Sequence, residues 1–271
     1  FELSEQFDTP VILRTTTRVS HCKSVVRPAD LAPVKDRDLA SDVPKYVMLP
    51  ANAKKRHLVV EERTAKLRAY ADNAPFNEII PGTGDVGFIA NGIAYQYVRE
   101  AFPDAPVLKL GMTWPLPEKK VRDFAASVKR LAVVEELEGF VEEQLKALGL
   151  TVHFGKAAFP PCGELTSRLI RDAVSGMPLT CKAPAPGLIM RPPTFCPGCS
   201  HRGLYTIIAK LKLYVSGDIG CYTLGALPPF SSMHTCICMG ASVSGAHGIS
   251  RGLSLKGMKQ KPVAVIGDST F

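Results

Sequence analysis

The stretch "DVGFIANGIAYQYVREAFPDAPVLKLGMT", residues 85–113, alternates short apolar runs with a segment of helical spacing. "DVGFIAN" predicts a buried strand, and Gly92 begins a helix through "IAYQYVREAF". "APVLKLGMT" predicts a second strand. Consecutive apolar residues are typical of strands that are covered on both faces. The stretch therefore predicts a strand–helix–strand unit with parallel strands.

The same alternation continues along the chain. "PLPEKKVRDFAASV" predicts a helix with proline in its first turn and an acid near its start. "KRLAVVEEL" predicts a third strand, and "EGFVEEQLKALG" a helix that ends at Gly149. Strands and helices of these lengths indicate a parallel sheet covered by helices. We expect residues 75–150 to form a compact α/β domain.

The segments around this domain are less regular. "TPVILRTTTRVS", within residues 1–26, predicts one strand whose partners precede residue 1, because a lone strand cannot form a core. Residues 27–74 form a linker and a helix from about Ala51 to Ala71. Residues 151–194 form a second linker, with one helix near "ELTSRLIRDAVSG" and an extended stretch at "CKAPAPGLIMRPP".

Composition excludes several classes of protein. The 271 residues carry 33 Lys+Arg against 25 Asp+Glu, a formal charge of +8, but the basic residues are scattered and follow no nucleic-acid-binding pattern. No window approaches the ~20 apolar residues of a membrane span. The chain has no initiator Met and no secretory leader, so we expect an internal piece of a longer cytoplasmic protein.

The C-terminal segment, residues 195–271, contains "CPGCSH", "SGDIGCYTLG", "MHTCICMGASVSGAHGISRG" and "KPVAVIGDST". The last phrase predicts a buried strand followed by Gly267 and Asp268. A glycine there lets the backbone approach a phosphate, and an aspartate offers a hard oxygen to Mg²⁺, although a simple turn explains the same residues. "MGASVSGAHGISRG" predicts a helix with a close-packing face. His234 and His247 are isolated, which favours structural roles.

Cys196, Cys199 and Cys221 raise a question that spacing leaves open. A redox dithiol usually opens a helix on a thioredoxin-like unit, which the preceding sequence lacks. An iron–sulfur cluster needs four thiolates, and a segment after residue 271 is one source for the fourth. Zinc needs a fourth nitrogen or sulfur ligand, for which the candidates are Cys236, Cys238 and His201. Spacing therefore favours neither a zinc site nor an iron–sulfur site over the other. Thiols without a ligand, free or in a disulfide, are the weaker alternative.

The four C-terminal phrases, in this order, resemble the thiamine-diphosphate domain of the 2-oxoacid:ferredoxin oxidoreductase family. "DTPVILRTTTRVSH", "YVMLPANAKKRHLVVEERTAKL" and "GIAYQYVREAFPDAPVLKLGMTWPLPEKKV" resemble it too, so the likeness covers nearly the whole chain. The resemblance implies that residues 1–26 are the tail of a pyrimidine-binding domain. It makes residues 75–150 a transketolase C-terminal-like α/β domain and residues 195–271 the start of a thiamine-diphosphate-binding α/β domain.

The resemblance also implies site residues. Asp268 matches the Mg²⁺ ligand that opens a Gly-Asp-Gly motif, with Gly267 before it and Ser269 where the third residue is often glycine. Gly220 and Cys221 match a loop near the diphosphate. The ligands of a [4Fe–4S] cluster next to thiamine are matched by three residues, Cys196, Cys199 and Cys221. The activating Glu, the Asn that completes the Mg²⁺ site and a ferredoxin-like tail are expected outside this chain.

The function implied by the resemblance is oxidative decarboxylation of an aryl 2-oxoacid. Thiamine diphosphate and Mg²⁺ would act with [4Fe–4S] clusters, coenzyme A would take the acyl group, and ferredoxin would take the electrons. A small β subunit is the implied partner, and we expect this chain alone to be inactive. The alternative is a non-enzymatic zinc-binding interaction module with "CPGC…C" as a knuckle. Iron with sulfide, against stoichiometric zinc, separates the two.

Overall fold

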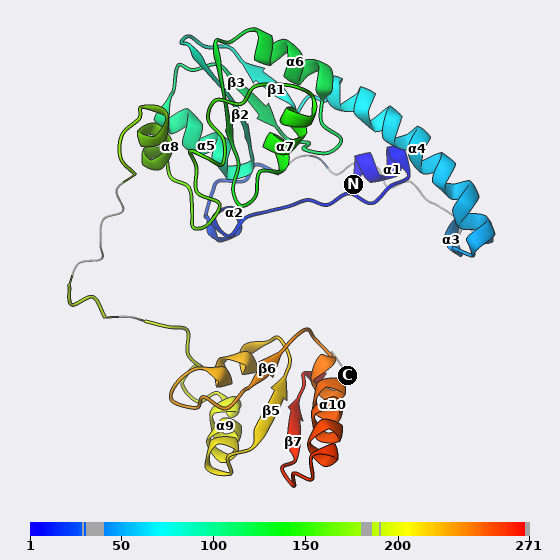
Figure 1. Ribbon diagram of the computed structural model, residues 1–271, viewed down its shortest axis with the longest axis vertical. Coiled ribbons are helices and arrows are strands. Elements are labelled where there is room, and N and C mark those ends of the chain that lie inside the picture. The colour runs from blue at the N-terminus through cyan, green and yellow to red at the C-terminus, as the bar shows by residue number, and fades with distance from the viewer. Residues whose placement is uncertain (29, 31–40, 180–185, 190, 269–271) are drawn as a thin grey trace. The chain divides into compact units, whose positions relative to one another are not determined.

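The computed structural model describes residues 1–28, 30, 41–179, 186–189 and 191–268. The chain divides into two units, Phe1–Lys182 and Ala183–Phe271 (Figure 1). The division falls within the predicted second linker. The assignment of either unit to a named domain stays a prediction. Within the described residues, no helix combines the length and the apolarity needed to cross a membrane.

Unit 1 contains a four-stranded sheet of order β1-β3-β2-β4. The three predicted strands are confirmed and are mutually parallel. An unpredicted fourth strand, β1, adds an antiparallel edge beside β3. β1 has only three residues, and its sequence shows no alternation. The strand bounds are β1 Glu78–Ile80, β2 Val86–Asn91, β3 Val107–Leu110 and β4 Arg130–Val134.

Helices cover both faces of this sheet (Figure 1). On one face, α5 and α8 bury residues against Phe88 and Ala90. On the other face, α6 and α7 pack against Ile89, which lies between Phe88 and Ala90 in β2. This alternation follows from the two-residue period of a strand. The helix bounds are α5 Gly92–Ala101, α6 Glu118–Ala126, α7 Phe140–Ala147 and α8 Ser167–Val174.

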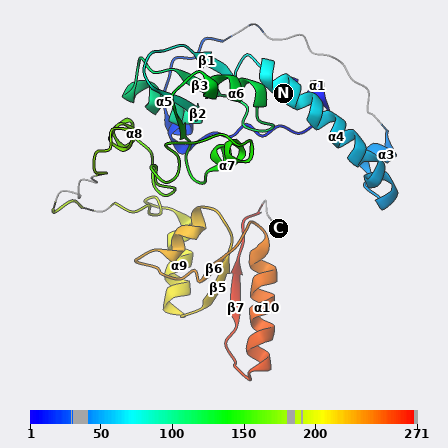
Figure 2. The same ribbon diagram turned by 45° about the horizontal axis from the view of Figure 1, so that its top comes forward.

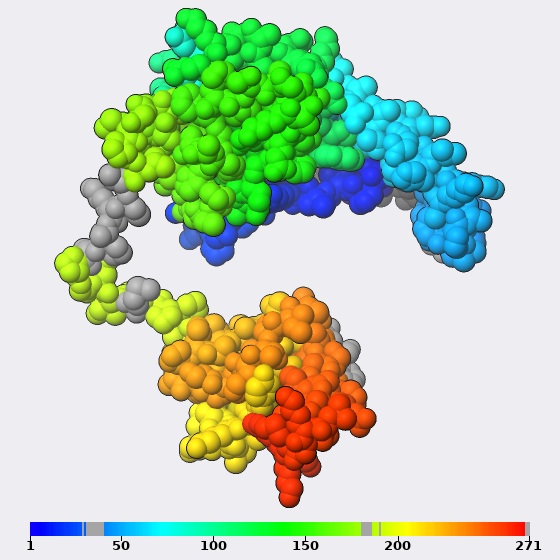
Figure 3. All heavy atoms as spheres, in the orientation of Figure 1, coloured from blue at the N-terminus to red at the C-terminus, as the bar shows by residue number. Residues whose placement is uncertain are grey.

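The predicted acid near the start of α6 is confirmed, since Glu118 lies in its first turn. The proline predicted in that turn lies one residue earlier, because Pro117 is the residue that precedes the helix. Gly149 follows α7 with a φ of 79°, a left-handed conformation that glycine adopts without strain. The long helix predicted near 51–71 is α4, Pro50–Asn73. It buries only Leu67 and Ala71, and its amino-terminal part extends away from the sheet of unit 1, with the short helix α3 (Val43–Tyr46) beside it (Figures 1 and 3).

The prediction of a strand in "TPVILRTTTRVS" is wrong. Residues 10–16 form no strand, and a short helix, α2, spans Thr17–His21. Ile12 and Leu13 are 90% and 88% exposed. Among the described residues no strand pairs with this segment, and without a partner an extended segment has no ladder to join. The other short helices of this region are α1 Glu2–Phe7 and α3 Val43–Tyr46.

Unit 2 contains a three-stranded parallel sheet of order β6-β5-β7, so its predicted α/β class is confirmed. α10 packs along β7 and β5 (Figures 1 and 2). A small core lies under α9 and includes Phe195, Tyr205 and Val215. The element bounds are α9 Ser200–Lys210, β5 Tyr214–Gly217, η1 Cys221–Ala226, β6 Thr235–Cys236, α10 Ala241–Leu255 and β7 Pro262–Val265.

Candidate functional site

The carboxyl ends of the three parallel strands of unit 2 meet at one edge of the sheet. Gly217, the last residue of β5, pairs with Cys236 in β6 and with Val265 in β7. The segments that leave these strands therefore start side by side. In open α/β sheets, ligands bind outside this edge. The edge is the candidate site because the segments that carry the predicted residues Gly220, Cys221, Gly267 and Asp268 all leave from it.

Asp218 is a residue of this edge that the sequence analysis missed. Its side chain is fully buried directly after β5. One carboxylate oxygen accepts a hydrogen bond from the backbone N–H of Gly240 at 2.8 Å, and the other accepts from Ser242 N–H at 2.7 Å. Both donors belong to the amino-terminal end of α10. A signal was in the sequence, since Asp218 follows a glycine at the end of a strand, as Asp268 follows Gly267 shortly after β7.

The loop after β5 carries the predicted residues Gly220 and Cys221. The Thr223 hydroxyl donates to the Asp218 carbonyl at 2.8 Å, and Gly220 N–H donates to the Thr223 hydroxyl oxygen at 3.1 Å. A Cβ on Gly220 would lie 2.8 Å from the ring of Tyr222, so a larger residue would force that ring to move. Cys221 is exposed at the start of η1.

Gly267 and Asp268 follow the end of β7, as predicted, and Asp268 is exposed. An accessible carboxylate at a strand end is the kind of hard oxygen ligand that Mg²⁺ takes, so the residue fits the predicted metal role. Ser269 lies outside the described residues. The assignment of all three residues to a cofactor stays a prediction.

Cys196 and Cys199 form a turn at the start of α9. Cys199 N–H donates to the Cys196 carbonyl at 3.1 Å, and Gly198 between them has a φ of 77°. The Cys199 sulfur lies 3.2 Å from Nδ1 of His201. Arg202 Nε donates to the Cys196 carbonyl at 3.0 Å. The turn thus holds one thiol against an imidazole.

The described residues contain no group of three or more His, Cys, Asp or Glu side chains placed to hold one metal ion. Cys196, Cys199 and Cys221 are all free thiols, and so are Cys236 and Cys238. The three predicted cluster ligands are therefore not assembled into one site. We derive no chemical step through a cluster, and the iron–sulfur and zinc assignments stay predictions.

The two histidines singled out in the sequence differ. His234 Nδ1 accepts a hydrogen bond from Val215 N–H at 3.1 Å, and its ring stacks on Tyr214 at 4.5 Å. The structural role expected for His234 is confirmed. His247 is exposed on α10.

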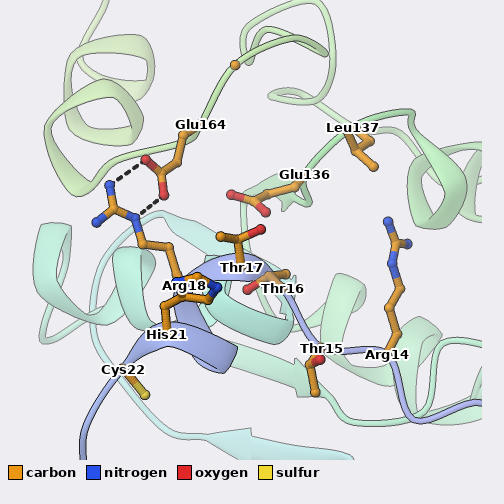
Figure 4. A pocket seen from close by; sticks show the side chains of 11 residues that line it. Arg14, Thr15, Thr16, Thr17, Arg18, His21, Cys22, Glu136, Leu137 and Glu164 are labelled. Carbon is orange, nitrogen blue, oxygen red and sulfur yellow. Dashed lines mark hydrogen bonds and ion pairs between the residues drawn. The ribbon is translucent and has the colours of Figure 1, made fainter. Parts of the chain in front are cut away.

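Unit 1 has a pocket of about 850 Å³ beside the carboxyl end of β4 (Figure 4). Arg18 and Glu164 form a two-bond ion pair across it, with Nη2 and Oε2 2.6 Å apart. The bond to Glu164 raises the pKa of Arg18, and the bond to Arg18 lowers the pKa of Glu164. Arg14 and Glu136 also line the pocket and add one positive and one negative charge. Because the charges of these four side chains cancel, they favour neither an anionic nor a cationic ligand.

No family model matches the chain. Along its whole length it is 36% identical to indolepyruvate oxidoreductase subunit IorA of Methanothermobacter thermautotrophicus. It is 38% identical to the same subunit of Methanothermobacter marburgensis and 35% identical to that of Archaeoglobus fulgidus. The chain is related to IorA along its whole length. The resemblance predicted from the sequence is therefore confirmed.

The chain spans about half the length of these IorA relatives, 47% of each of the three. Among solved structures, the chain is similar to a 2-oxoglutarate:ferredoxin oxidoreductase from Magnetococcus marinus. The similar region covers 47% of this chain and 23% of the chain in that structure. The sequence identity there is 20% and the TM-score 0.37.

Proposed function

We propose that this chain is part of a thiamine-diphosphate-dependent 2-oxoacid oxidoreductase. Its substrates would be aryl 2-oxoacids, indolepyruvate among them, its products acyl-CoA and CO₂, and its electron acceptor ferredoxin. The observation that carries the proposal is the match to IorA, at 35–38% identity, over the entire chain. The arrangement of Gly-Asp motifs at the carboxyl edge of β5 and β7 supports it, because this is where a diphosphate and its metal bind in α/β folds.

The residues of this chain would bind and orient the cofactor. Asp268 would supply a carboxylate oxygen to Mg²⁺, and Gly267 would let the backbone approach the diphosphate. The loop that contains Gly220 and Cys221 would lie near the same group, and Ser269 would complete the turn. When bound, thiamine diphosphate supplies the nucleophilic carbon and the electron sink, while the protein supplies orientation and electrostatics.

The complete enzyme would need parts beyond this chain. A small β subunit, coenzyme A and ferredoxin are the proposed partners, and the proposed location is the cytoplasm. Iron–sulfur clusters would carry the electrons singly to ferredoxin. The activating Glu and the Asn of the Mg²⁺ site would come from outside the chain, which would leave it inactive when isolated.

The test is the variant Asp268→Ala in the full-length protein assembled with its small subunit. We expect retention of thiamine diphosphate to be lost while the melting temperature stays near that of the parent, because Asp268 is exposed. The first measurement is the cofactor content of the protein after gel filtration. The second is the reduction of ferredoxin that depends on indolepyruvate and CoA. Asp85→Ala is the matched control, since Asp85 is an exposed aspartate that precedes a strand of unit 1. Normal cofactor affinity in Asp268→Ala would refute the assignment of Asp268.

A further inference from the structure

We propose that Asp218 is the positioning residue of the carboxyl edge of the unit 2 sheet, an inference that rests on the proposed function. Its side chain fixes the amino-terminal end of α10, and its main chain fixes the loop that carries Gly220 and Cys221. It directly follows β5, whose last residue pairs with the end of β7, the strand that leads to Asp268. One residue thus sets the relative positions of three segments that would hold the cofactor.

The buried carboxylate of Asp218 is fully hydrogen-bonded to the start of α10. An ionised carboxylate without partners is costly to bury, but both oxygens of Asp218 accept short hydrogen bonds, from Gly240 N–H at 2.8 Å and from Ser242 N–H at 2.7 Å. These donors lie at the positive end of the α10 dipole, which favours a negative charge. Gly240, at the cap position of α10, has no side chain to make such bonds itself.

The main chain of Asp218 contacts the loop that carries Gly220 and Cys221. The Asp218 carbonyl accepts from the Thr223 hydroxyl at 2.8 Å, and that hydroxyl oxygen accepts from Gly220 N–H at 3.1 Å. Gly217, the residue before Asp218, pairs with Val265 of β7. Asp218 directly follows this last pair on β5, as Ile266 follows it on β7, two residues before Asp268. A shift of Asp218 would move the loop, the helix end and the end of β7 together.

This arrangement has a consequence for how a diphosphate is held. The amino-terminal end of a helix is a common anion site, because its first N–H groups lack partners within the helix. At α10, Gly240 N–H and Ser242 N–H are already bonded to the Asp218 carboxylate. The protein's own anion occupies these two donors. Binding of a diphosphate would then depend on the Asp268 metal and on the loop that Asp218 positions.

Unit 1 offers a matched control for this kind of contact. Glu135 follows the parallel strand β4 and is 3% exposed. Its carboxylate accepts from Val141 N–H, at 2.9 Å to Oε2, and from Glu142 N–H, at 3.0 Å to Oε1, at the start of α7. Burial raises the pKa of Glu135 despite these bonds. Glu135 and Asp218 thus make the same contact, and only Asp218 belongs to the candidate site.

The experiment compares Asp218→Asn with Glu135→Gln in the full-length protein assembled with its small subunit. Each variant replaces one accepting oxygen by an amide, so we expect similar falls in melting temperature. We expect the Kd for Mg²⁺–thiamine diphosphate, measured by calorimetric titration, to rise about tenfold in Asp218→Asn, a value typical of one lost charge-assisted hydrogen bond. In Glu135→Gln it should stay within about twofold, because the hydrogen bonds of the Glu135 carboxylate lie within unit 1 and involve none of the residues that would hold the cofactor.

Hydrogen exchange supplies a readout that needs no cofactor. In Asp218→Asn, peptides that cover residues 219–223, 237–242 and 262–268 should lose protection together. If the parent binds no thiamine diphosphate, the proposed function fails, and the exchange data still decide the role of Asp218. Loss of protection confined to the first turn of α10 would reduce Asp218 to a simple helix cap and overturn the inference, as would a parent-like Kd.

A second variant covers the case in which Asp218→Asn does not fold. Thr223→Val removes the hydroxyl that links the Asp218 carbonyl to Gly220 N–H and keeps the side-chain volume. We expect the Kd to rise about threefold, in line with one neutral hydrogen bond, and exchange to increase in residues 219–223. An unchanged Kd in this variant would contradict the inference.

Discussion

At the scale of single residues, Tyr205 places a polar group in the core of unit 2. Its side chain is fully buried, stacks on Phe195 at 5.7 Å and lies 6.3 Å from Phe230. Its hydroxyl has no hydrogen-bond partner among the described residues. A buried hydroxyl of this kind carries a desolvation cost that no bond offsets. Burial, with smaller effects from Tyr222 and Cys236, raises its pKa to about 12.

We therefore expect Tyr205→Phe to stabilise unit 2 by about 1 kcal/mol, since the rings stay packed and the unbonded hydroxyl is removed. A group with a raised pKa gives stability that is complete below its unfolded pKa, near 10.0, and lost as the pH rises toward about 12. The advantage of the phenylalanine should grow across that window. Urea unfolding at several pH values measures both effects. Tyr222→Phe is the control, because its hydroxyl donates to the Ile219 carbonyl at 3.3 Å and its loss should destabilise.

At the scale of elements, sequence periodicity predicted the parts of the fold that are fixed by local burial. β2, β3 and β4 and the helices between them follow from apolar runs and helix end signals, because each is covered by its neighbours in the chain. The segment "TPVILRTTTRVS" has strand composition, but strand formation depends on a partner that local sequence cannot supply. Asp218 was missed for a related reason, since its donors on α10 lie more than twenty residues away.

The contact between α10 and β5 gives a prediction at this scale. A Cβ on Gly245 would lie 2.7 Å from the Ser216 hydroxyl oxygen, whereas a Cβ on Gly248 would meet nothing within 4 Å. We expect Gly245→Ala to destabilise unit 2 by about 1–3 kcal/mol through overpacking. Gly248→Ala, on the same helix, should stabilise it by about 0.5–1 kcal/mol, because alanine favours the helix. Chemical denaturation measures both, and equal effects of the two substitutions would show that α10 does not pack this closely.

At the scale of the whole molecule, the two units share a construction. Each has parallel strands, and in each a buried carboxylate directly after a strand binds the start of a helix, through Glu135 in unit 1 and Asp218 in unit 2. Each core draws its residues from one unit alone. The thiols are distributed unevenly, since five of the seven free cysteines of the described residues lie in unit 2.

The final prediction concerns these thiols in the full-length protein, purified without oxygen. We expect iron and sulfide in it, with Cys196, Cys199 and Cys221 among the cluster ligands, because the family resemblance implies these three residues, although the described residues do not bring them together into one site. Paramagnetic resonance of the reduced protein should then lose one cluster signal in Cys199→Ala. Cys162→Ala is the control, since Cys162 is an exposed free thiol of unit 1 and its loss should leave every signal intact. If Cys199→Ala keeps all signals of the parent, the pair is structural, and stoichiometric zinc would favour the zinc-binding module, with thiolate bonds of about 2.3 Å.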